Sequence, residues 1–451
     1  MKTMTENNKL GALKAILSEH LFSKEVENEM DRYPTQAIIG LGQGGGRIAA
    51  ELSRFGHPTF LLNSSKSDME EHNQLIPDSH RIVTSSEEFP ELEGTDKNAQ
   101  LGYEIAVENK KKYQQVAIAD EIQDAEFVWV CVSLGGGTGN GALKVALSYL
   151  SRVREARKLP GDKIPLGVIC SLPSSDERGS QFRKNALAGI SLLQSMVDQN
   201  QIGSILVIDN ERMNDYYEKS PLKTNGGHQV DAKSYSNMVV SGLIAEISSI
   251  PLLSGRSVLD KTELLSTLST PGWLSISRNN DIKTDSNLSG VIDMLFRNNE
   301  VLAEYDSTSA VNAAVAIMYP SSRNIEPRIA DDVYKFSSDL LETKVNLSIS
   351  NNSRVKNLTL YGIAVLPSPP TRIAKLNSEL QEWLQIEEDR KKAQKEAAAS
   401  LNLGEFDDFF STKQDKPQRR KKLSLDDFEE SDENNQNAKR FTPSSLDDID
   451  F

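Results

Sequence analysis

The sequence predicts an α/β protein built on a parallel sheet, with a second, smaller α+β domain towards the C-terminus. Strand-like and helix-like segments alternate between residues 37 and 208, which is the pattern of a parallel sheet with helices on both faces. From about residue 306 the pattern changes to longer strands around one helix. The 451 residues are enough for two domains with separate cores.

Short apolar runs and helical spacing of apolar residues give the expected elements. Strands are expected at 37–41, 58–62, 81–83, 127–132, 164–172 and 204–208. Helices are expected over 8–30 and near 47–54, 99–122, 142–158 and 180–199. A long apolar-periodic segment at 234–250 predicts a central helix, and a polar loop follows it at 254–259. The second domain is expected to hold strands at 310–319 and 357–366, a helix at 330–343 and a charged helix at 371–400.

The charge balance excludes a globular body that coats nucleic acid. There are 65 Asp and Glu residues against 51 Lys and Arg, a formal net charge of −14. Both cysteines, Cys131 and Cys170, lie in apolar runs, which indicates small buried hydrophobes in a reducing compartment. No early apolar run resembles a signal peptide and no segment approaches the length of a membrane span, so we expect a cytoplasmic protein.

Two glycine-rich loops follow two separate predicted strands. Residues 134–141 read Leu-Gly-Gly-Gly-Thr-Gly-Asn-Gly, and residues 40–46 read Gly-Leu-Gly-Gln-Gly-Gly-Gly. Such loops bring backbone N–H groups close to an anion, and the helix that follows points its positive end at the same place. Tight strand–helix turns that need glycine explain either loop alone about as well, but both together favour a phosphate cradle.

The first loop also fits the Gly-x-Gly-x-x-Gly pattern of a dinucleotide fold. That interpretation requires an acidic residue after the second strand to hold a ribose hydroxyl. Here Asn63-Ser64-Ser65 stands in that place. A nicotinamide-dependent oxidoreductase therefore remains only as a weaker alternative.

At this point the chain resembles the tubulin/FtsZ superfamily of GTPases. Residues 135–141 resemble its Gly-Gly-Gly-Thr-Gly-Ser/Thr-Gly signature, and 42–46 resemble its first nucleotide loop. Segments at 63–65, 94–102, 171–177 and 208–211 resemble further nucleotide loops in the same order. Within the superfamily, the TubZ branch of plasmid and phage segregation GTPases fits best, on Leu-Gly-Gly-Gly-Thr-Gly, Ser-Thr-Pro-Gly-Trp-Leu-Ser at 269–275, the long charged helix and the basic tail.

The resemblance implies a Rossmann-like GTPase domain, a central core helix and a smaller α+β C-terminal domain. We divide the chain into an N-terminal helix (1–34), a nucleotide-binding domain (35–232), a central helix (233–253), an α+β domain (254–370), a long helix (371–403) and a charged tail (404–451). GTP and Mg²⁺ are the implied cofactors. The implied nucleotide-binding residues are Gly42, Gln43, Gly44, Gly45, Gly46, Asn63, Asn98, Gly135, Gly136, Gly137, Thr138, Gly139, Asn140, Gly141, Glu177, Arg183, Asn210, Tyr235 and Asn237.

Base recognition is expected from residues near the central helix. Asn210 and Asn237 can each offer a donor and an acceptor to guanine, and Tyr235 can stack on the ring. An alternative that fits about as well is that Asn237 caps or begins the central helix.

Asp260 and Glu263 are the candidate catalytic acids. In this family the loop after the central helix completes the nucleotide site of the next subunit, which makes hydrolysis depend on polymerisation. Asp-x-x-Glu is equally a capping box that satisfies the first N–H groups of a helix, and both roles can coexist.

The tail combines Lys-Pro-Gln-Arg-Arg-Lys-Lys at 416–422 with acidic-aromatic units around 406–410, 425–428 and 446–451. Such a segment either solvates the chain end or docks on a partner. The resemblance implies a homopolymeric head-to-tail filament whose tail engages a TubR-like DNA-binding adaptor, so that plasmid or phage DNA follows the filament. The same motifs are compatible with an FtsZ-like division protein, or with a nucleotide-binding regulator that never polymerises.

Overall fold

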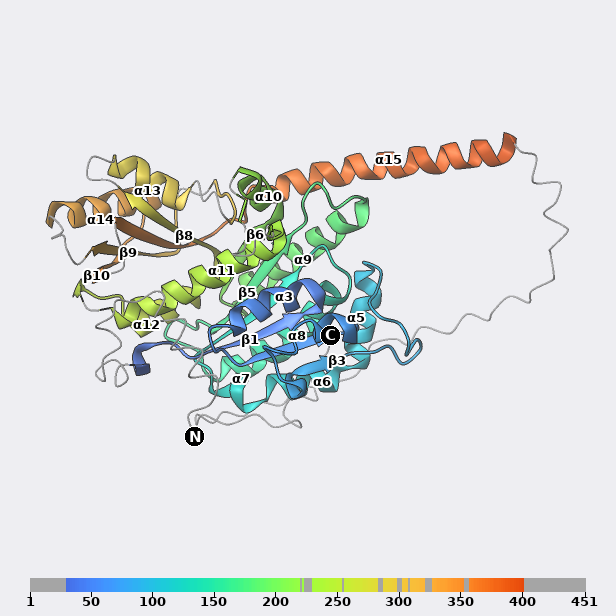
Figure 1. The fold of residues 1–451 in the computed structure, drawn as a ribbon, viewed down its shortest axis with the longest axis horizontal. Coiled ribbons are helices and arrows are strands. Elements are labelled where there is room, and N and C mark those ends of the chain that lie inside the picture. Colours follow the sequence, from blue (N-terminus) through green and yellow to red (C-terminus); the bar gives the residue numbers. More distant parts are fainter. Residues whose placement is uncertain are drawn as a thin grey trace.

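A computed structural model of the chain describes residues 30–400 except 220, 223–228, 254, 283–286, 298–301, 307–308, 321–326 and 353–356. One sheet of eleven strands runs through both halves of this region (Figure 1). Its order is β3-β2-β1-β4-β5-β6-β8-β11-β9-β10-β7. The predicted N-terminal helix over 8–30 lies outside the described residues apart from Met30, and so does the tail over 404–451.

The first six strands are all parallel, as predicted. They are β1 (Gln36–Leu41), β2 (Thr59–Asn63), β3 (Arg81–Val83), β4 (Phe127–Ser133), β5 (Leu166–Leu172) and β6 (Ser204–Asp209). Because they are parallel, their carboxyl ends meet at one edge of the sheet, which we call the carboxyl edge. Both glycine-rich loops leave the sheet at this edge.

Helices cover both faces of this parallel half. They are α3 (Gly42–Ser53), α4 (Lys66–Glu70), α5 (Ala99–Glu108), α6 (Lys110–Ala117), α7 (Asp120–Asp124), α8 (Thr138–Glu155), α9 (Ser180–Asp198), α10 (Asn210–Lys219) and α11 (Ala232–Ser249). Short 3-10 turns lie at η2 (Met30–Arg32), η3 (Asp78–His80) and η4 (Ile250–Leu252).

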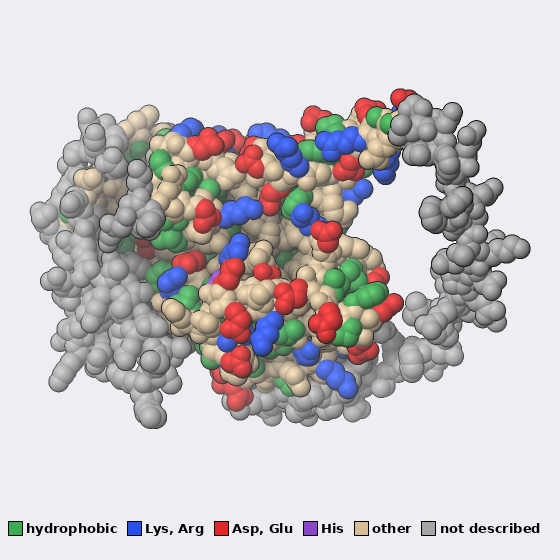
Figure 2. All heavy atoms as spheres, turned by 45° about the vertical axis from the view of Figure 1, so that its right-hand side comes forward, with side chains coloured by type: hydrophobic (Ala, Val, Ile, Leu, Met, Phe, Trp, Pro, Cys, Tyr) green, Lys and Arg blue, Asp and Glu red, His purple; other side chains and the backbone are tan. Residues whose placement is uncertain are grey.

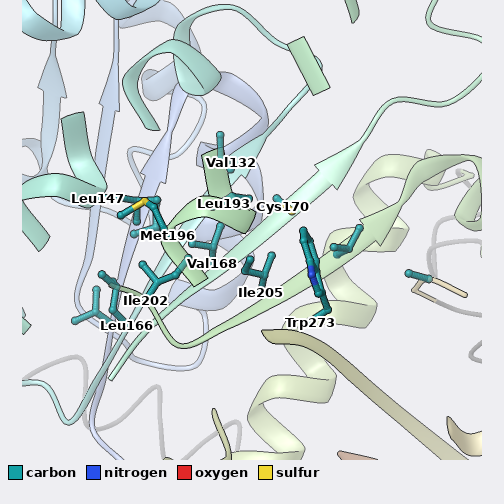
Figure 3. Packing of buried hydrophobic residues seen from close by; sticks show 14 of the residues in the cluster. Val132, Leu147, Leu166, Val168, Cys170, Leu193, Met196, Ile202, Ile205 and Trp273 are labelled. Carbon is teal, nitrogen blue, oxygen red and sulfur yellow. The ribbon is translucent and has the colours of Figure 1, made fainter. Parts of the chain in front are cut away.

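Alternation along the strands creates two hydrophobic cores. Ile39 and Val130 face the side of the sheet covered by α8 and α9, whereas Ile38 and Cys131 face the side covered by α3 and α11. Figure 3 shows the first core, where Val168 and Leu193 pack with Trp273. Since successive side chains point to opposite faces, nearly continuous apolar strands are what a sheet covered on both faces requires.

The C-terminal half continues the same sheet through the parallel pair β6–β8. Its strands are β7 (Gly255–Ser257), β8 (Gly272–Ile282), β9 (Asn312–Pro320), β10 (Val345–Asn352) and β11 (Leu358–Leu366). Its helices are α12 (Lys261–Leu268), α13 (Leu288–Phe296) and α14 (Pro327–Leu341), and the long α15 (Arg372–Ser400) follows. Antiparallel pairs β8–β11 and β9–β11 give this half its mixed, α+β character.

Several elements differ from the sequence-based expectations. α3 and α8 begin four to five residues earlier than expected, inside the glycine-rich segments. The helix expected over 99–122 is three helices, α5, α6 and α7. Asn109 separates the first two: it ends α5 and begins α6, and it donates its side-chain amide to the carbonyls of Ser85 and Ile105. The expected polar loop at 254–259 contains β7, and α4, α10, β8, α13 and β10 were not predicted, whereas α12 begins at the capping box that Asp260 and Glu263 offered.

Among the residues described, no helix combines the length and apolar character needed to cross a membrane.

Candidate functional site

The first turns of α3 and α8 touch at the carboxyl edge. A Cβ on Gly139 would lie 2.3 Å from the carbonyl oxygen of Leu41, and one on Gly42 would lie 2.7 Å from the amide nitrogen of Gly139. Gly42 also has a φ of +64°, which favours glycine. Two helix starts therefore share one spot, and each leaves first-turn N–H groups without intrahelical acceptors. We call this arrangement, residues 42–46 and 135–141, the cradle.

Thr138 joins two further loops to the cradle. Its hydroxyl lies 3.2 Å from that of Ser64, which follows β2, and 3.4 Å from that of Thr95. Gly137 packs closely on the loop that contains Thr95: a Cβ on Gly137 would lie 2.1 Å from the Thr95 hydroxyl oxygen. The structure thus brings together segments at 42–46, 63–65, 94–98 and 135–141, all of which the sequence had nominated.

The glycines of the cradle fall into two groups. Gly45 and Gly141 are required by packing, since added Cβ atoms would lie 2.1 Å from the Cys131 carbonyl oxygen and 2.4 Å from the Ala99 carbonyl oxygen. Gly136 and Gly46 are different, because the nearest atoms would be at 3.6 and 3.9 Å, ordinary contact distances. The fold does not explain these two glycines, whereas a ligand that approaches the backbone closely would. Gly44 belongs with the first group, because a Cβ would lie 2.5 Å from Ser133 Cβ, whereas Gly135 is intermediate, since a Cβ would lie 3.1 Å from the Phe182 ring and 3.4 Å from Pro173.

Gln43 and Asn63 converge on a carboxylate that the sequence analysis missed. Asp68 accepts hydrogen bonds from Gln43 Nε2 at 2.7 Å and from Asn63 Nδ2 at 3.1 Å. Asp68 lies in the first turn of α4, which Ser65 caps. The Ser-x-x-Asp spacing from 65 to 68 was the signal that could have located it.

Two predicted nucleotide contacts are occupied within the protein. Asn140 donates its amide to the carbonyl of Asn185 at 2.8 Å, and Asn98 caps α5 by accepting from the Leu101 amide at 3.1 Å. Asn185, which was not predicted, is buried in α9 and donates to the carbonyls of Lys97, Gly135 and Gly136 at 2.7 to 3.2 Å. It ties the cradle to the neighbouring loop.

The loop after β5 is held from inside the protein. The Arg183 side chain is 1 % exposed and donates to the carbonyls of Ser174, Glu177 and Gly179. Because the Arg183 guanidinium donates to carbonyls of this loop, it positions the loop and does not face a ligand. Glu177 accepts from the Ser174 amide at 3.1 Å and pairs with Lys233 at 3.1 Å, on the surface near α11.

The predicted base-contacting residues lie around α10 and α11. Asn210 is buried at the start of α10, and Tyr235 stacks nearly parallel to Tyr216 with 6.3 Å between ring centroids. Asp231, and not Asn237, caps α11. Asn237 therefore lies inside the helix, partly exposed, and the capping role considered for it is wrong.

Asp260 and Glu263 form the capping box that their spacing allowed. The Glu263 amide donates to Asp260 Oδ1 at 2.8 Å, and the Asp260 amide donates to Glu263 Oε2 at 3.2 Å. The next residue, Lys261, pairs with Glu126 at 2.6 Å, and Glu126 immediately precedes β4. The capping box therefore lies at the amino edge of the parallel sheet, opposite the cradle. The length of β4, about 20 Å at about 3.3 Å per residue, separates the two edges.

Asp68 lies at the cradle through its hydrogen bond with Gln43. Beside it, the Ser67 hydroxyl donates to Glu93 at 2.9 Å. In the described part of the chain, no three His, Cys, Asp or Glu side chains gather as a metal-binding group. Both carboxylate oxygens of Asp68 accept from side-chain amide N–H groups, which are not metal ligands, so a Mg²⁺ ion at the cradle would take most of its ligands from water and phosphate.

Comparison with known proteins agrees with this geometry. No protein-family model matches the chain. The tubulin-like protein TubZ of Bacillus cereus is 25 % identical over 431 residues, which covers 88 % of this chain and 93 % of TubZ. The GTPγS-form protofilament structure of TubZ from Bacillus thuringiensis serovar israelensis superposes with a TM-score of 0.65 at 20 % identity, covering 83 % of this chain and 99 % of that one. FtsZ of M. jannaschii, in its W319Y mutant form, superposes with a TM-score of 0.54 at 18 % identity, covering 76 % of this chain and 94 % of that one. By sequence the chain is similar to TubZ, and its fold is that of the tubulin/FtsZ superfamily.

Proposed function

We propose that this protein is a GTPase that assembles head to tail into filaments and hydrolyses GTP at the junction between subunits. The cradle would hold the phosphates through its backbone N–H groups and the positive ends of α3 and α8. Two of its glycines, Gly46 and Gly136, have room for a Cβ, which supports close approach of a ligand. Solved TubZ structures described as GTPγS-form and GDP-form protofilaments support the choice of nucleotide and of polymer.

The observation that carries the proposal is the position of Asp260. This exposed carboxylate lies at the edge of the sheet opposite the cradle, about one strand length away, so it is out of reach of its own nucleotide. In a head-to-tail filament the amino edge of one subunit meets the carboxyl edge of the next. Asp260, with Glu263 beside it, would then face the neighbour's terminal phosphate.

The roles of the residues follow from this arrangement. Asp260 of the adjoining subunit would orient a water molecule for in-line attack, while the cradle stabilises charge on the phosphate oxygens. Mg²⁺, bound mainly by phosphate and water beside the cradle residue Gln43 and its partner Asp68, would neutralise phosphate charge. Glu177 and Asn210 would contact the ribose and base, and Tyr235 would stack on guanine.

A pair of Asp260 variants separates the capping role from catalysis. Asp260→Asn keeps an oxygen that can accept from the Glu263 amide, whereas Asp260→Ala loses the cap, at about 1 kcal/mol. We expect both variants to bind GTP and form persistent filaments in a pelleting assay, with phosphate release reduced at least about a hundredfold, the scale of lost general-base catalysis. Normal phosphate release by Asp260→Asn filaments would contradict the proposed role.

We further propose that the filament moves plasmid or phage DNA in the cytoplasm through a TubR-like DNA-bound adaptor, with the tail at 404–451 as the docking segment. The repeated acidic-aromatic units and the basic cluster at 416–422 support this. Deleting 404–451 should leave GTP-dependent pelleting intact and abolish co-pelleting of adaptor–DNA complexes. Loss of filaments on deletion would contradict the assignment.

A further inference from the structure

The first half of α15 is fastened to the loops at the carboxyl edge by buried charges. Glu379 accepts hydrogen bonds from Arg183 Nε at 3.0 Å and from Arg372 Nη2 at 3.2 Å, so that one carboxylate of α15 lies between two guanidinium groups. The side chains of these arginines are only 1 % and 3 % exposed. Buried guanidinium groups need a counter-charge, and Glu379 provides it.

Both arginines bind the backbone of the loop at 173–179. Arg183 donates to the carbonyls of Ser174, Glu177 and Gly179, and Arg372 donates to that of Pro173 at 3.1 Å. The shape of this loop therefore depends on two side chains that Glu379 orients.

The same cluster reaches the start of α10. Arg372 Nε lies 3.5 Å from Asp209 Oδ1, immediately before Asn210. Glu211 connects the two loops a second time, because the Ser175 hydroxyl donates to it at 2.9 Å. The two loops proposed to hold the ribose and the base are thus fixed together.

A second fastening lies two turns further along α15. Glu387 accepts from the Ser180 amide and from the Ser180 hydroxyl, both at 2.8 Å, and so caps the start of α9. Beyond Glu387 the described side chains of α15 are exposed, and the helix leaves the body as an arm (Figure 1). Residues 388–400 extend about 20 Å at about 1.5 Å per residue.

We infer that Glu379 and Arg372 are positioning residues, and that docking of α15 holds the loops at 173–179 and 209–211 in the shape that binds nucleotide. The inference rests on the proposed GTP binding. Because linkage is reciprocal, GTP should strengthen the docking of α15, and displacement of α15 should weaken GTP binding. Because α15 is attached to the site in this way, a force on its exposed half, or a partner bound there, would change the affinity for the nucleotide.

Trp383 provides a direct signal for the docked helix. Its ring lies beside Arg183, with 6.0 Å between the ring centroid and Cζ, and the side chain is partly exposed. The other two tryptophans, Trp129 and Trp273, are buried in the cores. The Trp383→Phe variant therefore isolates the fluorescence of Trp383 by difference.

The test compares Glu379→Gln with Glu382→Gln in the full-length chain. Both remove one carboxylate from α15, but Glu382 is exposed. GTPγS is titrated at a protein concentration below assembly, and binding is measured by equilibrium dialysis alongside Trp383 emission and thermal unfolding. For Glu379→Gln we expect GTPγS affinity to fall about fivefold or more, the lower range of coupling between linked sites, and the nucleotide-dependent change in Trp383 emission to disappear. Glu382→Gln should retain both.

The outcomes are distinguishable. If the wild-type chain does not bind GTPγS, the proposed function fails and this inference fails with it. If the wild-type chain binds GTPγS and Glu379→Gln binds it equally well, only the positioning role is refuted. If Glu379→Gln unfolds, Glu387→Gln, which weakens docking outside the buried cluster, replaces it, and unchanged affinity and emission in that variant likewise refute the inference.

Discussion

The division of the cradle glycines into two groups leads to a sharp prediction about a pair of alanine substitutions. Gly139→Ala places a Cβ 2.3 Å from the carbonyl oxygen of Leu41, about 1 Å closer than ordinary contact. The atoms that it meets belong to the Leu41 backbone and cannot turn away as a side chain could. Gly136→Ala places a Cβ whose nearest protein atom is 3.6 Å away. The two variants add the same methyl group to the same glycine-rich segment, Gly139 in the first turn of α8 and Gly136 just before it, and differ chiefly in what that group meets.

The expected stabilities follow from these distances. Overpacking against backbone costs about 1–3 kcal/mol, so Gly139→Ala should lower the free energy of unfolding by at least that amount. Gly136→Ala should stay within about 0.5 kcal/mol of the wild type, as surface substitutions do. Urea unfolding monitored by circular dichroism measures both values.

Gly136→Ala should bind nucleotide much more weakly than the wild type, although its free energy of unfolding is nearly unchanged. If the backbone at 136 approaches the phosphates, a methyl group there separates them, and GTPγS affinity should fall by about tenfold or more, equal to about 1.4 kcal/mol. Equilibrium dialysis checks this. A Gly139→Ala protein as stable as the wild type would refute the packing argument, and a Gly136→Ala protein with normal affinity would refute the cradle assignment.

Two further predictions concern groups around the cradle. Asn185→Ala removes the amide that donates to the carbonyls of Lys97, Gly135 and Gly136. The free energy of unfolding measured in urea should therefore fall by about 1–3 kcal/mol, and GTPγS affinity should fall as well. Unchanged values would show that the cradle does not depend on these hydrogen bonds. Burial raises the pKa of Asp209 from 3.8 to about 6 although Arg372 opposes the shift, so the folded state holds more protons than the unfolded state between about pH 4 and pH 6. Wild-type stability should therefore fall by up to about 3 kcal/mol relative to Asp209→Asn as the pH rises through that window, and parallel pH profiles in urea unfolding would contradict this.

Much of the carboxyl edge was predictable because it depends on local sequence. The glycine-rich segments follow apolar strands, and parallel strands must bring their carboxyl ends together, so Thr138, Ser64 and Thr95 meet as the nominated loops required. The starts of α3 and α8 were placed too late, since helix propensity disfavours glycine and only the close contact of Gly42 with Gly139 shows why glycines lie in the first turns of both helices.

The remaining features depend on contacts between distant segments. Asn185 lies 49 residues from its partner Gly136 in the cradle, and Glu379 lies 196 residues from its partner Arg183, and no spacing in the sequence points to these contacts. Arg183 was nominated as a nucleotide ligand, yet its burial against three carbonyls is a tertiary property. β8 was missed because its second half, from Ser275 to Asp281, is largely polar. The strand is defined by its pairing with β11 along its length and with β6 at residues 272–274.

The surface explains why charge patterning said little about the site. Figure 2 shows acidic and basic side chains interspersed over the visible face, without one dominant patch. On this face no single-sign patch would attract a partner by bulk charge, which suits self-association through specific contacts.

Turnover per subunit as a function of protein concentration tests the shared site most directly. Phosphate release and light scattering are recorded together after GTP is added to the full-length chain at concentrations from well below to well above assembly. Because Asp260 lies opposite the cradle of its own subunit, turnover per subunit should be close to zero in dilute monomers and should rise with scattering to a plateau. A turnover per subunit that stays constant at every concentration, whether or not filaments form, would contradict a site shared between subunits.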